Sequence, residues 1–241
     1  MRLRMTDIIT PVILCGGGGT RLWPRSRVSR PKPFLPLVGH ETLFEQALSR
    51  TRDRSVFTEP MIVTGRTHLE HAESQAGDSE ITIILEPSAR NTAAAIALAA
   101  HRLLSDRVML VCPSDHHIAN TPAFVAAATR GAALAQEGWL VSFGIHASRP
   151  DTGFGYIKRG APISERRSDA GFRVDRFVEK PDRARAERFL EAGDYDWNGG
   201  IFAFTAGRYL EELADHRPDI AEAVERADRG HAVDRQSGGL G

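Results

Sequence analysis

Short apolar segments alternate with helical patterns along the first 145 residues of the chain. These apolar segments are rich in β-branched residues and are apolar at nearly every position, which predicts strands that are buried on both faces. They cover residues 11–15, 60–64, 81–85, 107–112 and 139–145. Buried strands of this kind are typical of parallel sheets with helices on both sides.

Helical patterns separate these strands and cover residues 42–52, 91–104 and 121–136. The first opens with Thr42 and Glu45, the spacing of a capping box, and the second begins at Asn91. In the third, Thr121 is the predicted N-cap, because Pro122 suits the first helical position. Repetition of strand, helix and strand predicts an α/β fold with a Rossmann-like, mostly parallel sheet flanked by helices.

The pattern changes after about residue 150. Strands are predicted at 153–160, 172–180 and 197–205, and the first two are joined by a polar loop rather than a helix. A charged helix is predicted at 182–192, and two more helices at 206–215 and 218–229. The mostly parallel sheet is therefore expected to be mixed, and residues 231–241 are expected to form a flexible tail.

Composition and charge narrow the classes of function. Of the 241 residues, 41% are hydrophobic, and 31 basic residues balance 31 acidic ones. A net charge of zero argues against general binding to nucleic acid or to a membrane surface. We find no membrane-spanning stretch and no signal-peptide pattern at the start of the chain. Cys15 and Cys112 lie in apolar segments, as buried thiols of a reducing compartment do, so we expect a cytoplasmic protein.

The first predicted strand runs into four glycines, Gly16–Gly19, and these are followed by Thr20. Consecutive glycines are entropically costly, and they are expected where backbone N–H groups approach an anion closely. The loop lacks the Gly-Lys-Ser/Thr ending of a P-loop. It matches a dinucleotide motif only in part, because Arg21 stands where the third small residue belongs.

Five cations follow this loop within twelve residues, with no acid among them: Arg21, Arg25, Arg27, Arg30 and Lys32. Like charges at close range repel by about 1 kcal/mol even in water, so this crowding predicts an anionic ligand. Arg21 directly follows the loop, and Lys32 is held between two prolines, so we assign these two residues to phosphates. A solvated basic face remains open for the other three.

The segment GGGGTRLWPRSRVSRPKPFLPL resembles the signature of sugar-1-phosphate nucleotidyltransferases, and within them of mannose-1-phosphate guanylyltransferases. Further segments resemble motifs of that family in the same order, namely EPSARNTAAAIALAA, PSDHHI, FGIHASRPDTGFGYI, FVEKPD and WNGGIF. The resemblance implies the nucleotide-diphospho-sugar transferase fold. It also implies transfer of GMP from GTP to mannose 1-phosphate, giving GDP-mannose and pyrophosphate.

The resemblance also implies roles for individual residues. The expected catalytic residues are Arg21, Lys32, Asp115 and Lys180, with Asp115 as the ligand of a Mg²⁺ cofactor. The expected nucleotide-binding residues are Gly16, Gly17, Gly18, Gly19, Thr20, Arg21, Arg90, Asn91 and Thr92. The expected sugar-phosphate-binding residues are Gly153, Tyr156, Glu179, Lys180 and Asn198. The chemistry agrees, because Asp115 follows a predicted strand and offers a hard oxygen ligand.

Two positions raise questions that the sequence leaves open. Glu179 and Lys180 are adjacent, and adjacent residues on a strand point to opposite faces unless the strand ends there, which Pro181 suggests. The family more often has serine where this chain has Gly199, so one hydroxyl contact is expected to be missing.

Residues 1–230 are expected to form one catalytic domain, with a nucleotide half at about 1–150 and a sugar half at about 151–230. The family's catalytic domain continues further and carries a second metal-binding aspartate, for which we find no candidate.

A weakly active or regulatory nucleotide-binding domain therefore remains an alternative, as does an enzyme for another nucleotide or sugar phosphate. A zinc site is a weaker alternative. His116 and His117 are adjacent, and His68 and His71 are three positions apart on a predicted helix, but a catalytic zinc needs three converging ligands and nothing in the sequence adds a third to either pair. A homodimer is possible.

Overall fold

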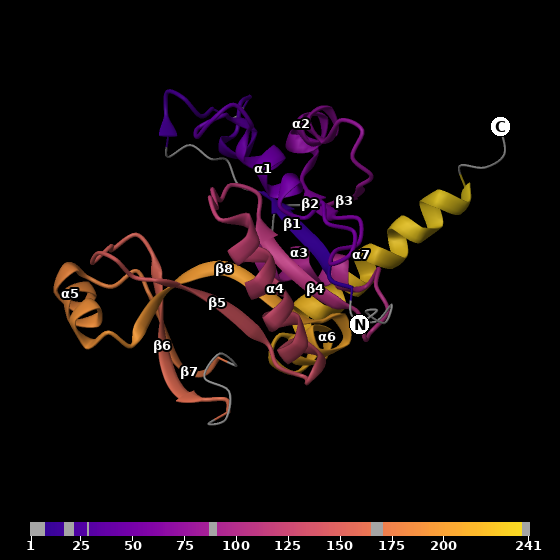
Figure 1. The fold of residues 1–241 in the computed structure, drawn as a ribbon. Helices are drawn as coiled ribbons and strands as arrows, with labels where there is room; N and C mark the ends of the chain where they lie inside the picture. The colour runs from indigo at the N-terminus through magenta and orange to yellow at the C-terminus, as the bar shows by residue number, and fades with distance from the viewer. Residues whose placement is uncertain (1–7, 17–21, 28, 87–90, 165–170, 238–241) are drawn as a thin grey trace. The chain divides into compact units, whose positions relative to one another are not determined.

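A computed structural model describes residues 8–16, 22–27, 29–86, 91–164 and 171–237 (Figure 1). The chain divides into two compact units. Unit 1 contains Met1–Leu140 and Ala203–Gly241, and unit 2 contains Val141–Phe202. The C-terminal helices thus belong to unit 1 and not to the second half expected from the sequence, because strand β8 leads the chain back and both helices contact α3.

The sheet of unit 1 is built from four parallel strands: β1 (Thr10–Cys15), β2 (Met61–Thr64), β3 (Thr82–Leu85) and β4 (Val108–Pro113). Their order is β3-β2-β1-β4, and Val12 of β1 is paired with Met61 on one side and Val111 on the other. β1 is buried almost throughout. The predicted α/β fold with a mostly parallel sheet is therefore confirmed, with strand ends shifted by one or two residues.

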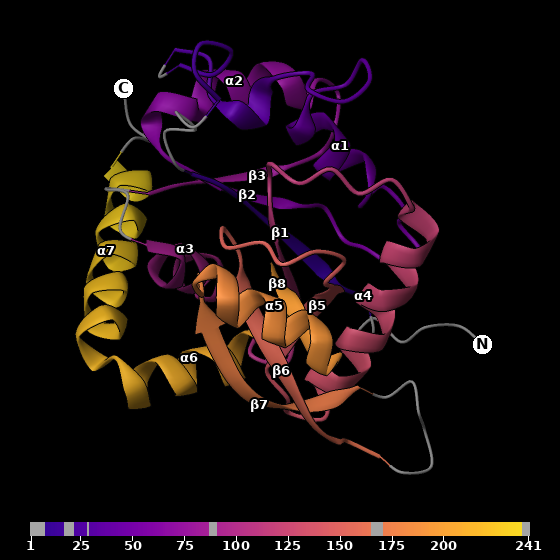
Figure 2. The same cartoon turned by 90° about the vertical axis from the view of Figure 1, so that its left-hand side faces the viewer.

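Helices cover both faces of this sheet. They are α1 (Leu43–Ser49), α2 (Arg66–Ala76), α3 (Asn91–Ala100), α4 (Thr121–Gln136), α6 (Ala206–His216) and α7 (Pro218–Ser237), with a short 3₁₀ helix, η3 (Lys32–Phe34). In Figure 2, α3, α6 and α7 lie on one side of the strands, and α1 and α4 lie on the other. Ala97 and Ala99 of α3 are fully buried, which lets the helix approach β1 and β2 closely.

The helix ends test the predicted caps. The capping box of α1 is confirmed, because the Thr42 hydroxyl accepts from Glu45 N and Glu45 Oε2 accepts from Thr42 N. The predicted cap of α4 is wrong by one residue: Asn120 Oδ1 accepts from Ala123 N at 3.0 Å, so Thr121 is already helical. Asparagine is the better cap.

α7 continues to Ser237, past its predicted end at 229. A single glycine, Gly230, costs a helix only about 1 kcal/mol, which is too little to end it. The helix overlaps the segment 231–241, whose flexibility remains a prediction. Among the described residues, no helix has the length and apolar character needed to span a membrane.

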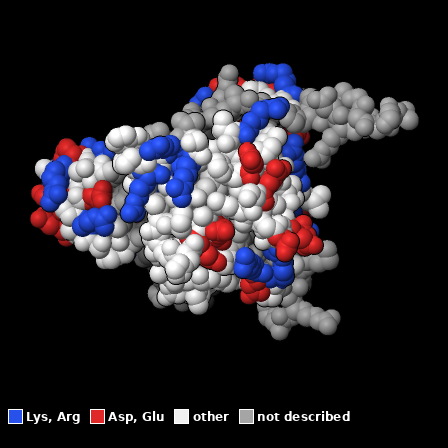
Figure 3. Space-filling view, turned by 90° about the horizontal axis from the view of Figure 1, so that it is seen from above, with Lys and Arg blue, Asp and Glu red and all other residues white. Residues whose placement is uncertain are grey.

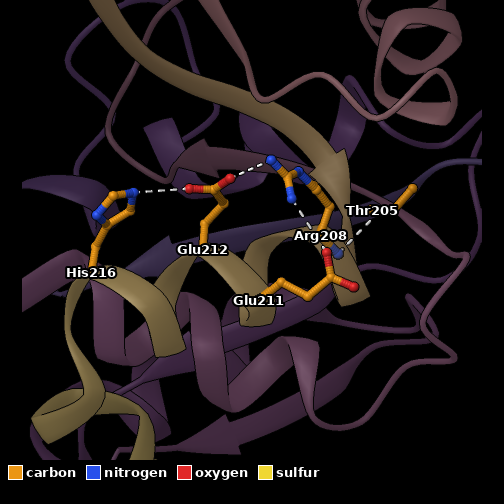
Figure 4. A network of polar contacts seen from close by, with 5 residues as sticks. All are labelled: Thr205, Arg208, Glu211, Glu212 and His216. Atoms are coloured by element: carbon orange, nitrogen blue, oxygen red, sulfur yellow. Dashed lines mark hydrogen bonds and ion pairs between the residues drawn. The ribbon is translucent and has the colours of Figure 1, made fainter.

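A chain of polar contacts runs along α6 (Figure 4). Thr205 caps the helix by accepting from Arg208 N at 3.3 Å. The Arg208 guanidinium pairs with Glu212, and the other carboxylate oxygen of Glu212 lies 3.1 Å from His216 Nε2. Spacings of three and four residues place these side chains on one helical face, where such pairs stabilise a helix by a few tenths of a kcal/mol each.

Unit 2 contains β5 (Val141–His146), β6 (Gly155–Pro162), β7 (Phe172–Glu179), α5 (Arg183–Ala192) and most of β8 (Tyr195–Thr205). β6 pairs antiparallel with both β7 and β8, and β5 pairs with β8. The eight strands described thus form one mixed sheet, as expected. Seven of them follow the order β3-β2-β1-β4-β8-β6-β7, and β5 lies off this path, paired with β8. Ala147, Tyr156, Ala186 and Trp197 form the centre of the core of unit 2.

Candidate active site

The carboxyl ends of the parallel strands in unit 1 carry two of the predicted site residues, Gly16 after β1 and Asp115 after β4. Glu86, which the sequence analysis did not single out, follows β3. A Cβ atom on Gly16 would lie 4.0 Å from Glu86 Oε2, so these two positions are close. Ser114 N donates to Leu14 O at 3.1 Å, which fixes the segment before Asp115 against β1. Ligands of open α/β sheets bind at this edge.

Lys32 and Asp115, which are 83 positions apart in the chain, meet at this edge. Lys32 Nζ donates to Asp115 Oδ2 at 2.8 Å, and the two side chains are 32% and 35% exposed. Lys32 opens η3, which is anchored because the Phe34 ring is buried against Phe44 and stacks on His71. The segment that presents the Lys32 amine is therefore held rigidly by the core.

The Asp115 carboxylate suits a magnesium ion of the kind that bridges phosphates. Mg²⁺ usually takes one or two carboxylates from the protein and completes its octahedron with phosphate oxygens and water. No group of three or more His, Cys, Asp or Glu side chains in the described part of the chain is arranged to hold a metal. Asp115 alone would thus suffice as the protein's ligand to a Mg²⁺ ion that a phosphorylated ligand also holds.

The segment that carries Asp115 is braced from α1. His117 Nδ1 lies 2.8 Å from Gln46 Oε1. One turn later, the Arg50 guanidinium lies over the Phe124 ring, 5.8 Å from its centroid. Arg50 is 5% exposed, and its Nη1 has no hydrogen-bond partner among the described residues. Burial lowers the pKa of Arg50, and burial likewise lowers the pKa of His116.

The four histidines considered for zinc have separate partners. His68 Nδ1 lies 3.1 Å from Cys15 O, and His71 stacks on Phe34. His117 contacts Gln46, whereas His116 lies within the electrostatic reach of Asp115 and Arg50. Among the described residues, these histidines take part in no group of three or more side chains that could hold a metal.

Part of the predicted nucleotide site lies outside the described residues, namely Gly17, Gly18, Gly19, Thr20, Arg21 and Arg90. Asn91 is the first residue of α3, and its side chain is outside the description as well. Thr92 is exposed in the first turn of α3. The predicted roles of these residues remain predictions.

In unit 2, a loop before β6 is organised by Asp151. Asp151 Oδ1 accepts from Gly153 N at 2.9 Å, and Oδ2 accepts from Arg149 Nε and Nη2 at 3.1 and 2.9 Å. These contacts, led by the Gly153 N–H, hold the pKa of Asp151 below its usual value. The Arg149 guanidinium in turn lies 5.0 Å from the centroid of the Trp197 ring. The loop is therefore fixed before any ligand arrives.

Two of the predicted sugar-binding residues, Glu179 and Asn198, converge on Gly155 at the start of β6. Gly155 pairs with Glu179 across the β6–β7 ladder. A Cβ on Gly155 would lie 2.8 Å from Glu179 Oε2 and 3.5 Å from Asn198 Cβ, so a side chain at this position would displace the Glu179 carboxylate. Another predicted residue, Gly153, is held by Asp151. The structure thus brings together Glu179, Asn198 and the backbone of Gly155.

The backbone at Lys180 shows how the adjacent side chains of Glu179 and Lys180 can face the same site. β7 ends at Glu179, and Lys180 has φ of 43°, a left-handed conformation that costs a non-glycine residue about 1–2 kcal/mol. The turn lets the adjacent side chains meet: Lys180 Nζ donates to Glu179 Oε1 at 2.6 Å. Strain of this kind concentrates at functional sites.

Tyr156 is placed differently from the sequence expectation. Its ring is 0% exposed in the core of unit 2, and its hydroxyl donates to Asp151 O at 2.9 Å. A ring in this position has no free face for a sugar. We correct its role from sugar contact to support of the Asp151 loop, because the register of β6 turns its side chain inward.

Sequence reasoning missed Glu86, Gln46, Arg50 and Asp151. Glu86 and Asp151 stand inside quoted motifs, so their positions were visible although their roles were not. Gln46 and Arg50 lie on an ordinary amphipathic helix with no motif, and only the fold reveals their contacts. Both cysteines are buried, as expected.

Comparison with known proteins agrees with this geometry. A sequence profile described as "Nucleotidyl transferase" matches residues 10–237. The chain therefore belongs to the nucleotidyl transferase family.

Individual relatives narrow the comparison. The chain is 46% identical over 229 residues to the xanthan biosynthesis protein XanB of Xanthomonas campestris, covering 92% of this chain and 47% of that protein. It is 44% identical over 226 residues to a mannose-1-phosphate guanylyltransferase of Klebsiella pneumoniae, covering 91% and 48%. The chain thus spans about half the length of these curated relatives.

A solved structure from Thermus thermophilus, described as a mannose-1-phosphate geranyltransferase, superimposes with a TM-score of 0.81. It is 37% identical, and the match covers 92% of this chain and 64% of that one. The expected nucleotide-diphospho-sugar transferase fold is thereby confirmed.

Proposed function

We propose that this chain provides the nucleotide and sugar-phosphate sites of a mannose-1-phosphate guanylyltransferase. In this reaction GMP passes from GTP to mannose 1-phosphate, and GDP-mannose and pyrophosphate form. The observation that carries the proposal is the 2.8 Å contact between Lys32 Nζ and Asp115 Oδ2 at the carboxyl edge of the parallel sheet. The name of the Klebsiella pneumoniae relative supports the choice of nucleotide and sugar.

The chemistry requires alignment more than proton transfer. A phosphate oxygen of mannose 1-phosphate forms a bond to the α-phosphorus of GTP, and the bond from that phosphorus to the bridging oxygen breaks. The electron pair leaves with pyrophosphate. Because the nucleophile is already an anion, the protein needs no general base, and charge neutralisation by cations is its main contribution.

In this proposal Lys32 and Asp115 pair with each other only while no ligand is bound. An ion pair about one-third exposed contributes only about 0–1 kcal/mol, so it opens at little cost. The Lys32 ammonium then binds a phosphate oxygen, and the Asp115 carboxylate becomes free to bind the metal ion. Bound Mg²⁺ would add positive charge beside the phosphates.

Glu86 is the proposed acceptor for the base. Guanine presents N1–H and N2–H₂ as adjacent donors, a pattern that a carboxylate matches, whereas adenine offers an acceptor at N1. Glu86 Oε2 lies close to Gly16 at the start of the glycine loop, and partial burial raises the pKa of its carboxyl. Glu86→Gln is expected to weaken discrimination between GTP and ATP.

In unit 2, Glu179 and Asn198 would bind sugar hydroxyls, and Lys180 would bind the sugar phosphate. The Lys180–Glu179 contact at 2.6 Å keeps the Lys180 amine beside the carboxylate until a phosphate replaces it. A serine at Gly199 would require a small local shift, because its Cβ would lie 3.0 Å from Phe143 O.

Pyrophosphate release tests the proposal. The purified chain is incubated with Mg²⁺, with GTP, ATP, UTP or dTTP, and with mannose or glucose 1-phosphate. Sustained release with GTP and mannose 1-phosphate, lost in Asp115→Asn, is expected. Preference for another pair would contradict the assigned substrates. Binding of GTP without release of pyrophosphate would instead favour a nucleotide-binding module without activity of its own.

A further inference from the structure

Three arginines near the start of the chain have no role in the proposed reaction. Between Ile8 and His40 the sequence contains no Asp or Glu, although acids and bases are equal in number over the whole chain. Of the cations in this segment, Lys32 pairs with Asp115. Arg25, Arg27 and Arg30 pair with no acidic side chain among the described residues.

These arginines line one hollow in unit 1. Arg25, Arg27, Arg30 and Ser29 form one part of its wall, and Leu35–Leu37 with Pro24 form the rest. Its volume is about 590 Å³, within the range of small-molecule sites. Lys32 is not among the lining residues, because its amine contacts Asp115. Figure 3, which looks onto this side of the molecule, shows a group of Lys and Arg side chains without an Asp or Glu among them.

The backbone that presents the arginines is fixed by its own hydrogen bonds. Arg27 N donates to Arg30 O at 3.0 Å, and Arg30 N donates to Arg27 O at 2.9 Å, which closes a tight turn. Arg25 N is bonded to Leu22 O at 2.8 Å. Arg27 Nε donates to Pro24 O at 3.3 Å, which orients the guanidinium and leaves both of its Nη groups for a ligand. The opposite wall is held because Leu43 N donates to Leu35 O.

We infer that this hollow is a second oxyanion site, separate from the Lys32–Asp115 pair, and that it binds a small molecule carrying phosphate groups. Guanidinium groups match phosphate oxygens in pairs of parallel hydrogen bonds, and several together favour a ligand with more than one negative charge. The apolar wall of Leu35 and Leu37 adds contact surface for the remainder of such a molecule. An anion here also removes the repulsion among the three cations.

The test uses inorganic pyrophosphate as the probe, without Mg²⁺, in calorimetry of the full 241-residue chain. Arg25→Gln with Arg30→Gln removes two of the arginines, whose side chains are exposed and pair with no acidic side chain among the described residues. Arg66→Gln with Arg130→Gln is the matched control, because both of its arginines are exposed outside the hollow and the net charge changes equally. We expect the R25Q/R30Q variant to bind pyrophosphate at least tenfold more weakly than the control at this site.

Further arms separate this site from the proposed active site. Lys32→Ala is expected to retain pyrophosphate binding in the hollow, and R25Q/R30Q is expected to retain GTP binding with Mg²⁺. Equal pyrophosphate affinity in R25Q/R30Q and the control would overturn the inference. It would also be overturned if Lys32→Ala abolished all pyrophosphate binding, or if R25Q/R30Q weakened GTP as strongly as pyrophosphate. Failure of the wild-type chain to turn over GTP would refute only the proposed function.

Discussion

Replacing Gly155 with alanine perturbs the proposed sugar site at one atom. The new Cβ would lie 2.8 Å from Glu179 Oε2, whereas ordinary contacts between nonbonded heavy atoms begin at about 3.5 Å. The carboxylate must therefore retreat by roughly 0.7 Å. Glu179 can do so easily, because it is the end of a flexible side chain that is 70% exposed. Its contact with Lys180 Nζ must move as well.

Binding and stability should respond differently to this change. Misplacement of a contact group by 1 Å can cost about a hundredfold, so we expect mannose 1-phosphate to lose about tenfold in kcat/KM, or roughly 1.4 kcal/mol. The free energy of unfolding should change by no more than about 0.5 kcal/mol. Replacing glycine lowers the conformational entropy of the unfolded chain, which stabilises the fold and offsets the cost of displacing the Glu179 carboxylate. The KM for GTP should remain unchanged.

Gly199→Ala is the matched control for Gly155→Ala. Its Cβ would meet a backbone atom, Phe143 O at 3.0 Å, and Ile145 Cδ1 at 3.2 Å, and the backbone cannot move without distorting the sheet. Overpacking of this kind costs about 1–3 kcal/mol, which lowers Tm by about 2–4 °C per kcal/mol. Steady-state kinetics and thermal unfolding of both variants test the reasoning. Gly155→Ala with unchanged affinity for the sugar phosphate would refute it.

Four other predictions concern stability. Lys180→Gly should stabilise the fold by about 1 kcal/mol by relieving its left-handed strain, whereas Lys180→Ala should not, and both should lose sugar-phosphate binding; equal stabilities would contradict the strain. Arg50→Met should leave stability unchanged or raise it by about 1 kcal/mol in urea unfolding, because a buried donor without a described partner is removed; a loss above about 2 kcal/mol would contradict this. Asn120→Ala should cost about 1 kcal/mol and Thr121→Ala clearly less, unless the cap is misassigned. Burial raises the pKa of Cys15 to about 11 and of Cys112 to about 12, so the unfolded chain releases these protons first, and stability falls as pH rises above about 9. Cys112→Ala should make that fall shallower by about 1 kcal/mol per pH unit, and an unchanged slope would contradict the burial.

The order of elements could be predicted because each depends on local pattern. Apolar segments without alternation indicated strands buried on both faces, and the capping box at Thr42 marked the start of α1. Ends of elements were less certain, because competing local signals have similar energies. Asn120 and Thr121 are both acceptable caps, and the choice between them depends on the preceding loop.

The candidate site was predictable residue by residue but not as an arrangement. Motifs identified Lys32 and Asp115 separately, but the contact between these residues, 83 positions apart, depends on the fold, which one sequence does not reveal. Tyr156 was assigned a role that the fold does not allow, because a residue inside a binding motif can face the core. Arg50 could not be identified from the sequence, because its contact with the Phe124 ring of α4 arises only in the fold.

The most direct test of the account is calorimetric binding of GTP with and without Mg²⁺ to the wild-type chain, Asp115→Asn and Lys32→Ala. The account predicts that Mg²⁺ strengthens binding to the wild type, that Asp115→Asn loses this enhancement, and that Lys32→Ala binds GTP more weakly even without metal. Undiminished enhancement by Mg²⁺ in Asp115→Asn, together with unchanged metal-free affinity in Lys32→Ala, would contradict it.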